Sequence, residues 1–444
     1  MSGLAAVLLA GGAVVSGSDR CASPATVRLS EAGAAVRIGQ SPANIPETCH
    51  LVVASAAVSP DNPEYAEAQR RGIAIIKYAR LLGRLMSESV GLAIAGTHGK
   101  STTSAMVAYV LLRAGLDPTY VIGAVAPQLG GSSRAGGGEF FVAESCEYDS
   151  SFLNLRPTIA AILNIEEDHL DYYKDLDAIV ASFAAFASLV PPAGRLIVNG
   201  EDRNVARAVA GVSAAIETFG TDESCHWRAT GLEIIEGSYA FTLARGGVVQ
   251  GRCRMMLPGR HNVYNAAAAA AVAIHCGVAP QQALDYLGEF HGADRRITLR
   301  GQEKGILVVD DYAHHPTEIQ ASLRAVRERY QPARLWCVFQ PHQHSRTRFL
   351  MKDFARSFGQ ADTVLLPQIY FVRDSETERA NVSGGDLAAQ IRLQGGDAQF
   401  LDTFERILDH LRAHVQPGDL VLTMGAGDVW KVADEYLRRL RADR

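Results

Sequence analysis

Short apolar runs alternate along the chain with stretches in which apolar residues recur at helical spacing. Ile319, Leu323 and Val326 show that spacing, because intervals of three and four residues place side chains on one face of a helix. The runs expected to form strands lie at residues 13–16, 51–54, 73–76, 90–95, 140–143, 158–163, 196–198, 306–309, 335–339, 363–366 and 420–423. Such an alternation of strands and helices is typical of parallel α/β architecture.

The length of 444 residues is sufficient for about three domains. We expect a Rossmann-like domain at residues 1–88, a central α/β domain with a mainly parallel sheet at residues 89–297, and a second Rossmann-like domain at residues 298–444. An alanine-rich helix begins near His261 and stops at Gly277. Because this helix is apolar on all sides, we expect it to be buried in the central domain.

The first domain is expected to be truncated, because the chain begins inside a helix that ends at Gly11. Rossmann-like domains open with a strand and a glycine-rich turn ahead of such a helix, so we expect the true start to lie upstream of Met1. The apolar opening lacks the basic leader of a signal peptide. Ser18 and Asp19 follow the strand expected at residues 13–16, which is where a Rossmann-like domain holds its ligand.

Composition narrows the class of protein. Of the residues, 48% are hydrophobic and 20% are charged, and the net charge is −5. This balance is ordinary for a soluble protein and provides no basic surface for nucleic acid. The seven cysteines are scattered, with no Cys-x-x-Cys pair, which indicates reduced thiols and a cytoplasmic location. No apolar run is long enough to cross a bilayer, so we expect no membrane insertion.

A phosphate loop follows the apolar run at residues 90–95 and leads directly into a helix. Gly96 and Gly99 allow backbone N–H groups to approach a phosphate, since neither residue has a Cβ. Lys100 would supply a point charge for the outer phosphates, and Ser101 a hydroxyl for a magnesium ion. Glycine turns between strands and helices often serve packing alone, but the Gly-Lys-Ser triplet favours binding of a nucleoside triphosphate.

Glu144 and His169 follow the strands expected at residues 140–143 and 158–163. Ligands of open α/β sheets bind at the carboxyl ends of strands, so the two side chains could share a magnesium ion beside the phosphate loop. Taken singly, Glu144 would be explained as a surface carboxylate and His169 as a hydrogen-bonded polar side chain, with no role in binding. Their placement after consecutive strands favours the metal site.

Two polar motifs mark the last part of the chain. Residues 310–316 place aspartates and histidines before a proline, a pattern that also caps a helix. Residues 339–348 carry a dense set of donors after a strand. These donors suit an anion such as a carboxylate, and a solvated loop explains them equally well.

Six motifs occur in one order along essentially the whole chain, and together they resemble the Mur ligase family. They are Gly-Thr-His-Gly-Lys, Ala-Glu…Ser-Phe, Asn-x-x-x-Asp-His-x-Asp, Gly-Arg-His-Asn-x-x-Asn-Ala, Asp-Asp-Tyr-x-His-His-Pro-Thr-Glu and Phe-Gln-Pro-His-x-x-x-Arg-Thr-Arg. The resemblance is to the members that add the first amino acid. It implies ATP-dependent ligation of L-alanine to the lactyl carboxylate of UDP-N-acetylmuramate through an acyl phosphate, in the synthesis of peptidoglycan precursors.

The resemblance also implies ATP and Mg²⁺ as cofactors and assigns roles to residues. The catalytic residues would be Lys100, Glu144, His169 and Arg346. ATP would contact Gly96, Thr97, His98, Gly99, Lys100, Ser101, Thr102, Asn262, Asn265 and Asp311. The metal would be bound by Ser101, Glu144 and His169, the amino acid by Tyr312, His314, His342 and Arg346, and the UDP-sugar by Ser18 and Asp19.

Several alternatives stay open at this point. Family members often carry arginine and tyrosine where this chain has Gln343 and His344, so glycine or L-serine could replace L-alanine as substrate. A ligase that adds a recycled tripeptide to the same sugar is a close enzymatic rival. A catalytically impaired UDP-sugar-binding paralogue and a generic phosphate-loop kinase are more distant alternatives. We expect a monomer or a weak homodimer.

Overall fold

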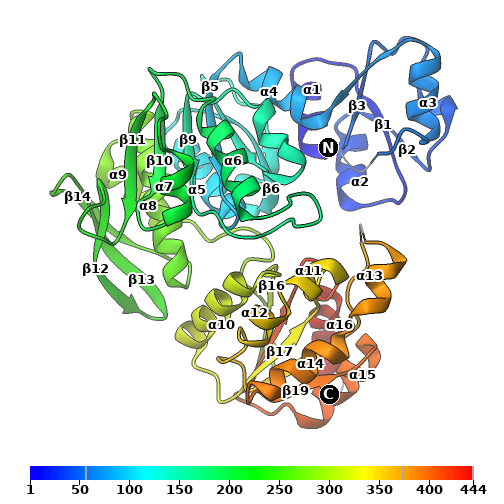
Figure 1. The fold of residues 1–444 in the computed structure, drawn as a ribbon, viewed down its shortest axis with the longest axis vertical. Helices are drawn as coiled ribbons and strands as arrows, with labels where there is room; N and C mark the ends of the chain where they lie inside the picture. The colour runs from blue at the N-terminus through cyan, green and yellow to red at the C-terminus, as the bar shows by residue number, and fades with distance from the viewer. Residues whose placement is uncertain (56–57, 373, 443–444) are drawn as a thin grey trace.

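The computed structural model describes residues 1–55, 58–372 and 374–442. We refer to residues 1–88, 89–297 and 298–444 as the N-terminal, middle and C-terminal regions, keeping the divisions proposed from the sequence. Figure 1 shows the blue N-terminal region beside the cyan and green middle region, with the yellow to red C-terminal region below. The strands form two pairs and two larger sheets, and the expected α/β class is confirmed.

The N-terminal region contains two parallel pairs of strands, β1 with β2 and β3 with β4. Its strands are β1 (Ser16–Asp19), β2 (Ala35–Ile38), β3 (Leu51–Ala54) and β4 (Ala74–Lys77). Its helices are α1 (Ser2–Ala10), α2 (Pro24–Glu31), the 3₁₀ turn η1 (Pro42–Asn44), α3 (Pro63–Arg70) and α4 (Tyr78–Met86). Helix α1 packs against strands of the middle region rather than within its own region alone.

The strand expected at residues 13–16 is wrong in its position. Strand β1 begins at Ser16, opposite Ala35, and ends at Asp19, opposite Ile38. Ser18 and Asp19 therefore lie within the strand and not beyond its end. The apolar residue Val14 is fully exposed outside it. Backbone pairing with β2 determines the position of the strand, because strand propensity depends strongly on the neighbouring strand.

The middle region is built on a ten-stranded sheet in the order β14-β13-β12-β11-β10-β9-β5-β8-β6-β7. Within this order, the consecutive strands β12-β11-β10-β9-β5-β8-β6 are parallel to one another. Strand β7 at one edge and strands β13 and β14 at the other are antiparallel to their neighbours. The strands of this sheet are β5 (Val90–Ala95), β6 (Thr119–Ala126), β7 (Gly131–Arg134), β8 (Phe140–Ser145), β9 (Ile159–Ile162), β10 (Arg195–Asn199), β11 (Ala215–Gly220), β12 (Trp227–Ile235), β13 (Ser238–Arg245) and β14 (Val248–Arg254).

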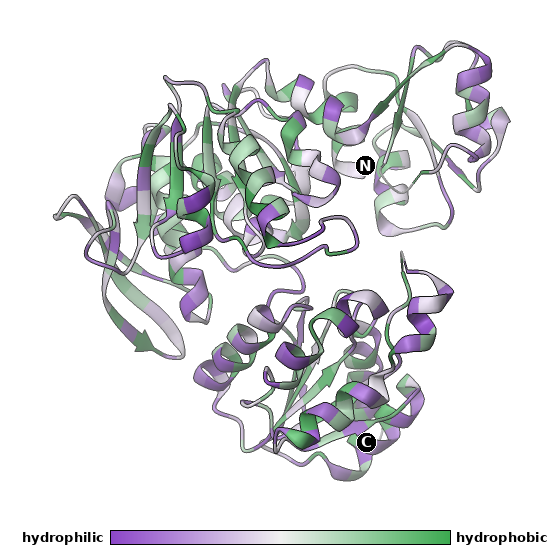
Figure 2. Cartoon of the chain, in the orientation of Figure 1, coloured by the Kyte–Doolittle hydropathy of each residue, from purple (hydrophilic) through white to green (hydrophobic). Residues whose placement is uncertain are grey.

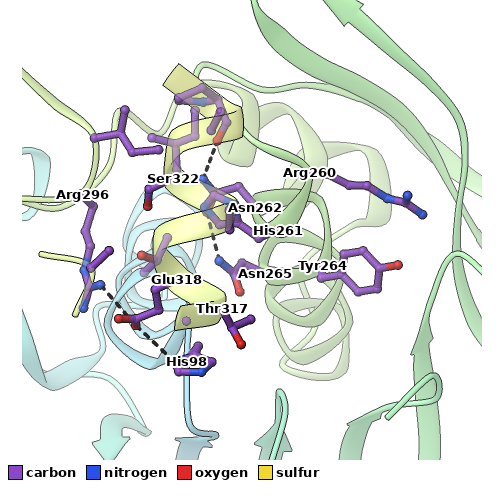
Figure 3. Close-up of a pocket in the computed structure, with 18 of the residues that line it drawn as sticks. His98, Arg260, His261, Asn262, Tyr264, Asn265, Arg296, Thr317, Glu318 and Ser322 are labelled. Carbon is purple, nitrogen blue, oxygen red and sulfur yellow. Dashed lines mark hydrogen bonds and ion pairs between the residues drawn. The ribbon is translucent and has the colours of Figure 1, made fainter. Parts of the chain in front are cut away.

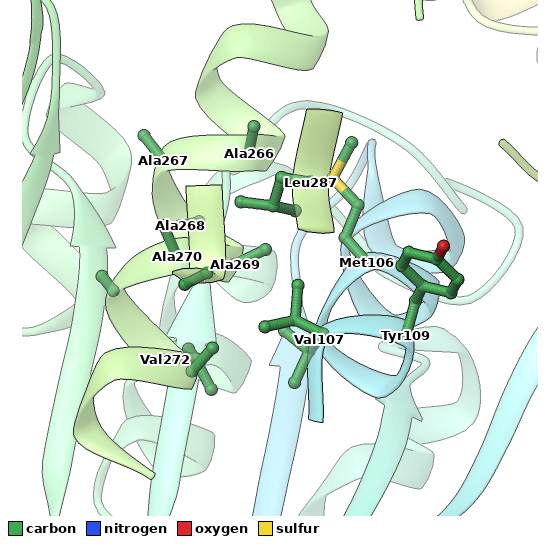
Figure 4. Close-up of a cluster of buried hydrophobic side chains, with 14 of the residues drawn as sticks. Met106, Val107, Tyr109, Ala266, Ala267, Ala268, Ala269, Ala270, Val272 and Leu287 are labelled. Carbon is green, nitrogen blue, oxygen red and sulfur yellow. The ribbon is translucent and has the colours of Figure 1, made fainter. Parts of the chain in front are cut away.

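Helices cover both faces of this sheet, as Figure 1 shows. They are α5 (Lys100–Arg113), α6 (Leu176–Ala187), α7 (Arg203–Ala208), α8 (Arg260–His275) and α9 (Pro280–Gly288), with the 3₁₀ turns η2 (Pro127–Leu129) and η3 (Tyr148–Asn154). The alanine-rich helix is α8, and it is buried as expected. Its small side chains allow it to pack closely against α5, where Met106 and Val107 meet Ala269 in one apolar cluster (Figure 4).

The C-terminal region has a six-stranded sheet in the order β15-β16-β20-β17-β18-β19, in which only β15 is antiparallel to its neighbour. Its strands are β15 (Thr298–Glu303), β16 (Ile306–Asp311), β17 (Leu335–Phe339), β18 (Thr363–Leu366), β19 (Ala398–Phe400) and β20 (Leu420–Met424). Its helices are α10 (Pro316–Tyr330), α11 (His344–Phe349), α12 (Met351–Ala355), α13 (Glu376–Asn381), α14 (Gly384–Leu393), α15 (Phe404–His414) and α16 (Trp430–Ala442).

Hydropathy follows this layering. In Figure 2 the central strands of both larger sheets are green, and the surrounding helices present purple faces outward. Within the described ranges, helices long and apolar enough to span a membrane are absent.

Candidate functional site

The phosphate loop lies between β5 and α5, as the sequence predicts. Gly96 and Gly99 have φ angles of 148° and 81°, values that L side chains rarely adopt. A Cβ at Gly99 would fall 2.6 Å from Asn265 Oδ1. Glycine is therefore required here both for the backbone conformation and for the close approach of α8.

The first residue of α5 is held in place by a dense set of contacts. Lys100 Nζ donates to the carbonyl oxygens of Gly96 (2.6 Å) and Thr97 (2.9 Å) and lies 3.0 Å from Glu147 Oε1. Burial by itself would lower the pKa of Lys100, but the surrounding carboxylates, Glu147 foremost, outweigh it and raise that pKa. The ammonium group is thus permanently charged at the mouth of the loop.

Glu147 also lies beside the histidine that the sequence singles out. His169 Nε2 is 3.6 Å from Glu147 Oε1, and His169 has a φ of 54°. Burial lowers the pKa of His169, so its imidazole is neutral and able to bind a metal. Within the described part of the chain, its buried Nδ1 makes no hydrogen bond. Ser101, the second residue of α5, is buried at the same loop.

Glu144 lies at the carboxyl end of its strand, as expected. It lies within β8, which extends to Ser145, and its Oε2 accepts a hydrogen bond of 2.6 Å from the backbone N–H of Gly123. The close contacts to Lys100 and His169 come from Glu147, while the charge of Glu144 also acts on Lys100. Sequence reasoning missed Glu147, although a second carboxylate three residues beyond the first was visible.

A cavity of about 400 Å³ lies between the middle and C-terminal regions (Figure 3). It is enclosed by the phosphate loop, the start of α8 and one face of α10. Of the residues expected to contact ATP, six line this cavity and the other four belong to the loop or helix beside it. The six are His98, Gly99, Thr102, Asn262, Asn265 and Asp311.

Polar side chains line the cavity in a fixed arrangement. Asn265 Nδ2 donates to Asn262 Oδ1 (3.0 Å), and Asn262 Nδ2 donates to the carbonyl of Pro258 (2.8 Å). Asp311 accepts from the backbone N–H of Ala313 and from Ser322 Oγ, both at 2.9 Å. Burial raises the pKa of Asp311. These contacts orient the asparagines and the carboxylate before any ligand arrives.

Four rings of the C-terminal region lie next to one another in a row. Tyr312 lies against the His314 ring at 5.3 Å, and His314 lies 6.0 Å from the His342 ring, which stacks on Tyr370. Burial lowers the pKa of His314 to about 4. Its imidazole is therefore neutral, and its Nδ1 lies 3.0 Å from the Tyr312 carbonyl.

Arg346 joins this row of rings to the middle region. Its Nε and Nη2 lie 3.0 and 2.9 Å from the same Oδ1 of Asp168, and its Nη1 lies 3.2 Å from His342 Nδ1. Beside it, Gln343 is 1% exposed, and within the described residues its Nε2 has no hydrogen-bond partner. Asp168, His169, Gln343 and Arg346 line one small pocket.

The two residues expected at the UDP-sugar are held by contacts of the N-terminal region. Ser18 Oγ donates to Glu64 Oε2 at 2.7 Å, and Asp19 Oδ1 accepts from the backbone N–H of Cys21 at 3.3 Å. Neither residue lines the cavity between the middle and C-terminal regions.

Three family models match successive parts of the chain. Residues 1–89 match the Mur ligase family, catalytic domain, residues 94–273 match the Mur ligase middle domain, and residues 295–427 match the Mur ligase, glutamate ligase domain. The six sequence motifs all fall within the second and third of these ranges.

Curated relatives match over almost the full length. The chain is 41% identical to a UDP-N-acetylmuramate–L-alanine ligase of Caldanaerobacter subterraneus, over 98% of this chain and 95% of the relative. It is 44% identical to the enzyme of the same name from Solibacter usitatus, over 100% of this chain and 93% of the relative.

Solved structures agree with these relatives. The UDP-N-acetylmuramate-alanine ligase of Thermotoga maritima has a TM-score of 0.84 and 25% identity, covering 100% of this chain and 97% of that one. A murein peptide ligase of Psychrobacter arcticus has a TM-score of 0.73 and 27% identity, covering 99% and 96%. The chain therefore belongs to the Mur ligase family.

Proposed function

We propose that this chain joins L-alanine to the lactyl carboxylate of UDP-N-acetylmuramate, consuming ATP and releasing ADP and phosphate. The names of the full-length relatives support this reaction. The observation that carries the proposal is the meeting of Lys100, Glu147 and His169 at the phosphate loop, next to a cavity that two regions of the chain enclose.

The chemistry requires activation of the acid, because a carboxylate is a poor electrophile for an amine. Transfer of the γ-phosphoryl group of ATP to the carboxylate gives an acyl phosphate. The amine of L-alanine then attacks the acyl carbon, the amide bond forms, and phosphate leaves with one oxygen of the original carboxylate. The charge on the moving phosphoryl group would be stabilised by Lys100 and by the N–H groups at the start of α5.

The side chains present fit a magnesium ion. Ser101 offers a hydroxyl, Glu147 a carboxylate and His169 a neutral imidazole, and we propose these three as its ligands in place of the set that included Glu144. When bound, Mg²⁺ would neutralise phosphate charge and hold the transferring group in line.

We propose that the amino acid binds in the small pocket at Arg346. The guanidinium would hold the substrate carboxylate, and the buried Nε2 of Gln343, which has no hydrogen-bond partner among the described residues, would supply a second donor. His342 contacts Arg346 and continues into His314 and Tyr312, which we propose as further contacts of the amino acid. Because these residues belong to the C-terminal region, closure of that region would exclude water while the acyl phosphate exists.

The UDP-sugar would bind at the N-terminal region, with Ser18 and Asp19 as proposed contacts. We also propose that the reaction takes place in the cytoplasm, since all seven cysteines are free thiols. A monomer or a weak homodimer is the proposed assembly.

An assay of ADP release tests the proposal. Release should require UDP-N-acetylmuramate and a free amino acid together, and L-alanine should give a higher kcat/KM than glycine, L-serine or a tripeptide. ADP release without the sugar would contradict the ligase assignment. A preference for another amine would leave the ligase assignment standing and overturn the choice of L-alanine.

A further inference from the structure

A second group of side chains that could bind a metal lies at the edge of the cavity described above, apart from the proposed magnesium ligands Ser101, Glu147 and His169. His98 belongs to the phosphate loop, Glu166 follows β9, and His315 caps the start of α10. One ligand atom from each lies within 4.8 Å of the others. His98 and Glu166 come from the middle region and His315 from the C-terminal region, so the group crosses the boundary between them.

The distances are close to those of a bound ion. His98 Nε2 is 3.5 Å from Glu166 Oε2, and His315 Nδ1 is 3.8 Å from the same oxygen. Nitrogen and oxygen ligands of a tetrahedral zinc ion lie about 3.4 Å from one another. Small side-chain rotations would therefore bring the three atoms onto one metal ion.

The outer nitrogens of both histidines face oxygen acceptors. His98 Nδ1 lies 3.2 Å from Glu318 Oε1, and His315 Nε2 lies 3.0 Å from the carbonyl oxygen of Glu167. A histidine that binds a metal through one nitrogen commonly donates its other N–H to a carboxylate or a carbonyl. Both rings thus present their inner nitrogens to Glu166.

The inner nitrogen of His98 lies in ion-pair range of Glu166 alone among the contacts described. Among the described residues, its buried Nε2 makes no hydrogen bond. His315 Nδ1 receives only a long contact of 3.4 Å from the backbone N–H of Thr317. Glu166 also accepts from Thr317 Oγ1 (2.5 Å), and its side chain is 34% exposed. The open side leaves room for water as a fourth ligand.

Burial alone would lower the pKa of His98, but Glu318 and Glu166 raise it to about 9, so a metal ion would displace a proton from this group when it binds. Two carboxylates, Glu166 and Glu318, face the two imidazoles. Arg296 offsets part of this charge from 3.9 Å away, at Glu318. Two imidazoles with one carboxylate suit zinc and its neighbours among the transition metals better than magnesium, whereas the proposed magnesium site has one imidazole.

We infer that His98, Glu166 and His315 form a binding site for a transition-metal ion such as Zn²⁺. The ion would link the phosphate loop to the start of α10 and so hold the middle and C-terminal regions together. The inference does not depend on the proposed ligase reaction, and metal binding is measured without nucleotide or sugar.

The test is a titration of the full chain with Zn²⁺ in magnesium-free buffer, repeated with Co²⁺ to record visible absorption. The wild type should bind one Zn²⁺ that both His315→Ala and Glu166→Gln fail to bind. Glu318→Gln should weaken binding by roughly 10–100-fold, as loss of an outer partner does. His169→Ala, at the proposed magnesium site, should bind Zn²⁺ as the wild type does.

Zn²⁺ could also bind at a surface histidine pair or at cysteine thiols, and each of these needs a control. His410 and His414 stack at 4.2 Å on α15, so the His410→Ala variant removes adventitious binding there. A thiolate-to-cobalt band would reveal binding by cysteine. Circular dichroism checks the folding of each variant. If His315→Ala does not fold, the test rests on Glu166→Gln, whose amide oxygen can still accept the hydrogen bond from Thr317. Equal Zn²⁺ binding by wild type and Glu166→Gln, or no binding by wild type, would overturn the inference.

Discussion

Arg346 and Asp168 form a buried ion pair between the C-terminal and middle regions. Two guanidinium nitrogens lie 2.9 and 3.0 Å from one carboxylate oxygen, and the two side chains are 6% and 7% exposed. Burial alone would raise the pKa of Asp168, but Arg346 outweighs it and holds that pKa well below its usual range. The proposed amino-acid-binding arginine is thus oriented by a carboxylate from the opposite region.

Replacing that carboxylate should weaken amino-acid binding selectively. Asp168→Asn removes a charge-assisted contact worth about 1.5–3 kcal/mol, so we expect KM for L-alanine to rise by roughly 10–100-fold while KM for ATP changes little. Steady-state kinetics measures both constants. The matched control is Glu378→Gln, which breaks the exposed pair with Arg348 and should change neither. An unaltered KM for L-alanine in Asp168→Asn would contradict the role given to Arg346.

The two glutamates of the Ala-Glu-Ser-Cys-Glu segment should behave differently. Glu147→Gln should lower kcat by about 100-fold or more, since it removes a charged proposed metal ligand beside Lys100. Glu144→Gln should retain most activity, because an amide oxygen can still accept from the Gly123 N–H. Single-turnover ADP formation compares the variants. Greater damage from Glu144→Gln than from Glu147→Gln would restore the original metal assignment.

Glu217 provides a prediction on acid stability. It accepts hydrogen bonds from Arg195 (2.6 Å), Trp227 Nε1 (2.6 Å) and Arg245 (2.8 Å), and His275 Nε2 lies 3.1 Å away. Burial alone would raise the pKa of Glu217, but these contacts, led by His275, lower it to about 2.

A lowered folded-state pKa stabilises the protein above the unfolded value and loses that effect as pH falls. The unfolded pKa of Glu is about 4.3, so stability on the order of 1–3 kcal/mol should disappear between about pH 4.3 and pH 2. Urea unfolding across this window should show a shallower pH dependence in Glu217→Gln. Glu236→Gln, at a glutamate 83% exposed beside Arg254, is the control and should leave the slope unchanged.

A larger side chain at the contact between α5 and α8 should lower the free energy of unfolding. Ala269 is fully buried in the cluster of Figure 4, and a leucine there would overpack it at a cost of about 1–3 kcal/mol. The free energy of unfolding of Ala269→Leu measures this. Leu393→Ala, at a side chain 75% exposed, should change stability by less than about 0.5 kcal/mol. A neutral Ala269→Leu would mean that the interface has unfilled space.

The sequence predicted those features that depend on local pattern. Strands Leu51–Ala54, Leu335–Phe339 and Thr363–Leu366 lie where the apolar runs placed them, and α5 begins at Lys100. In Leu335–Phe339 and Thr363–Leu366 every residue of the apolar run is buried in the sheet, so the run itself predicts the strand. Strand β1 begins later than predicted because its register is determined by pairing with β2, which is a tertiary contact.

The site was less accessible to sequence reasoning than the fold. Motif order indicated Lys100 and His169, but which glutamate approaches them depends on where β8 ends and on the turn after it. Asp149 and Ser150 have positive φ angles in that turn, and nothing in the residue pattern predicts this backbone conformation. The pairing of Arg346 with Asp168, 178 positions apart in the chain, requires two regions to meet.

The most direct test of the central claim follows the oxygen atoms of the sugar. UDP-N-acetylmuramate labelled with ¹⁸O in its lactyl carboxylate is incubated with the protein, ATP, Mg²⁺ and L-alanine, and the released phosphate is examined by mass spectrometry. Activation through an acyl phosphate predicts one ¹⁸O atom in each phosphate formed. Unlabelled phosphate formed together with the amide product would contradict the account.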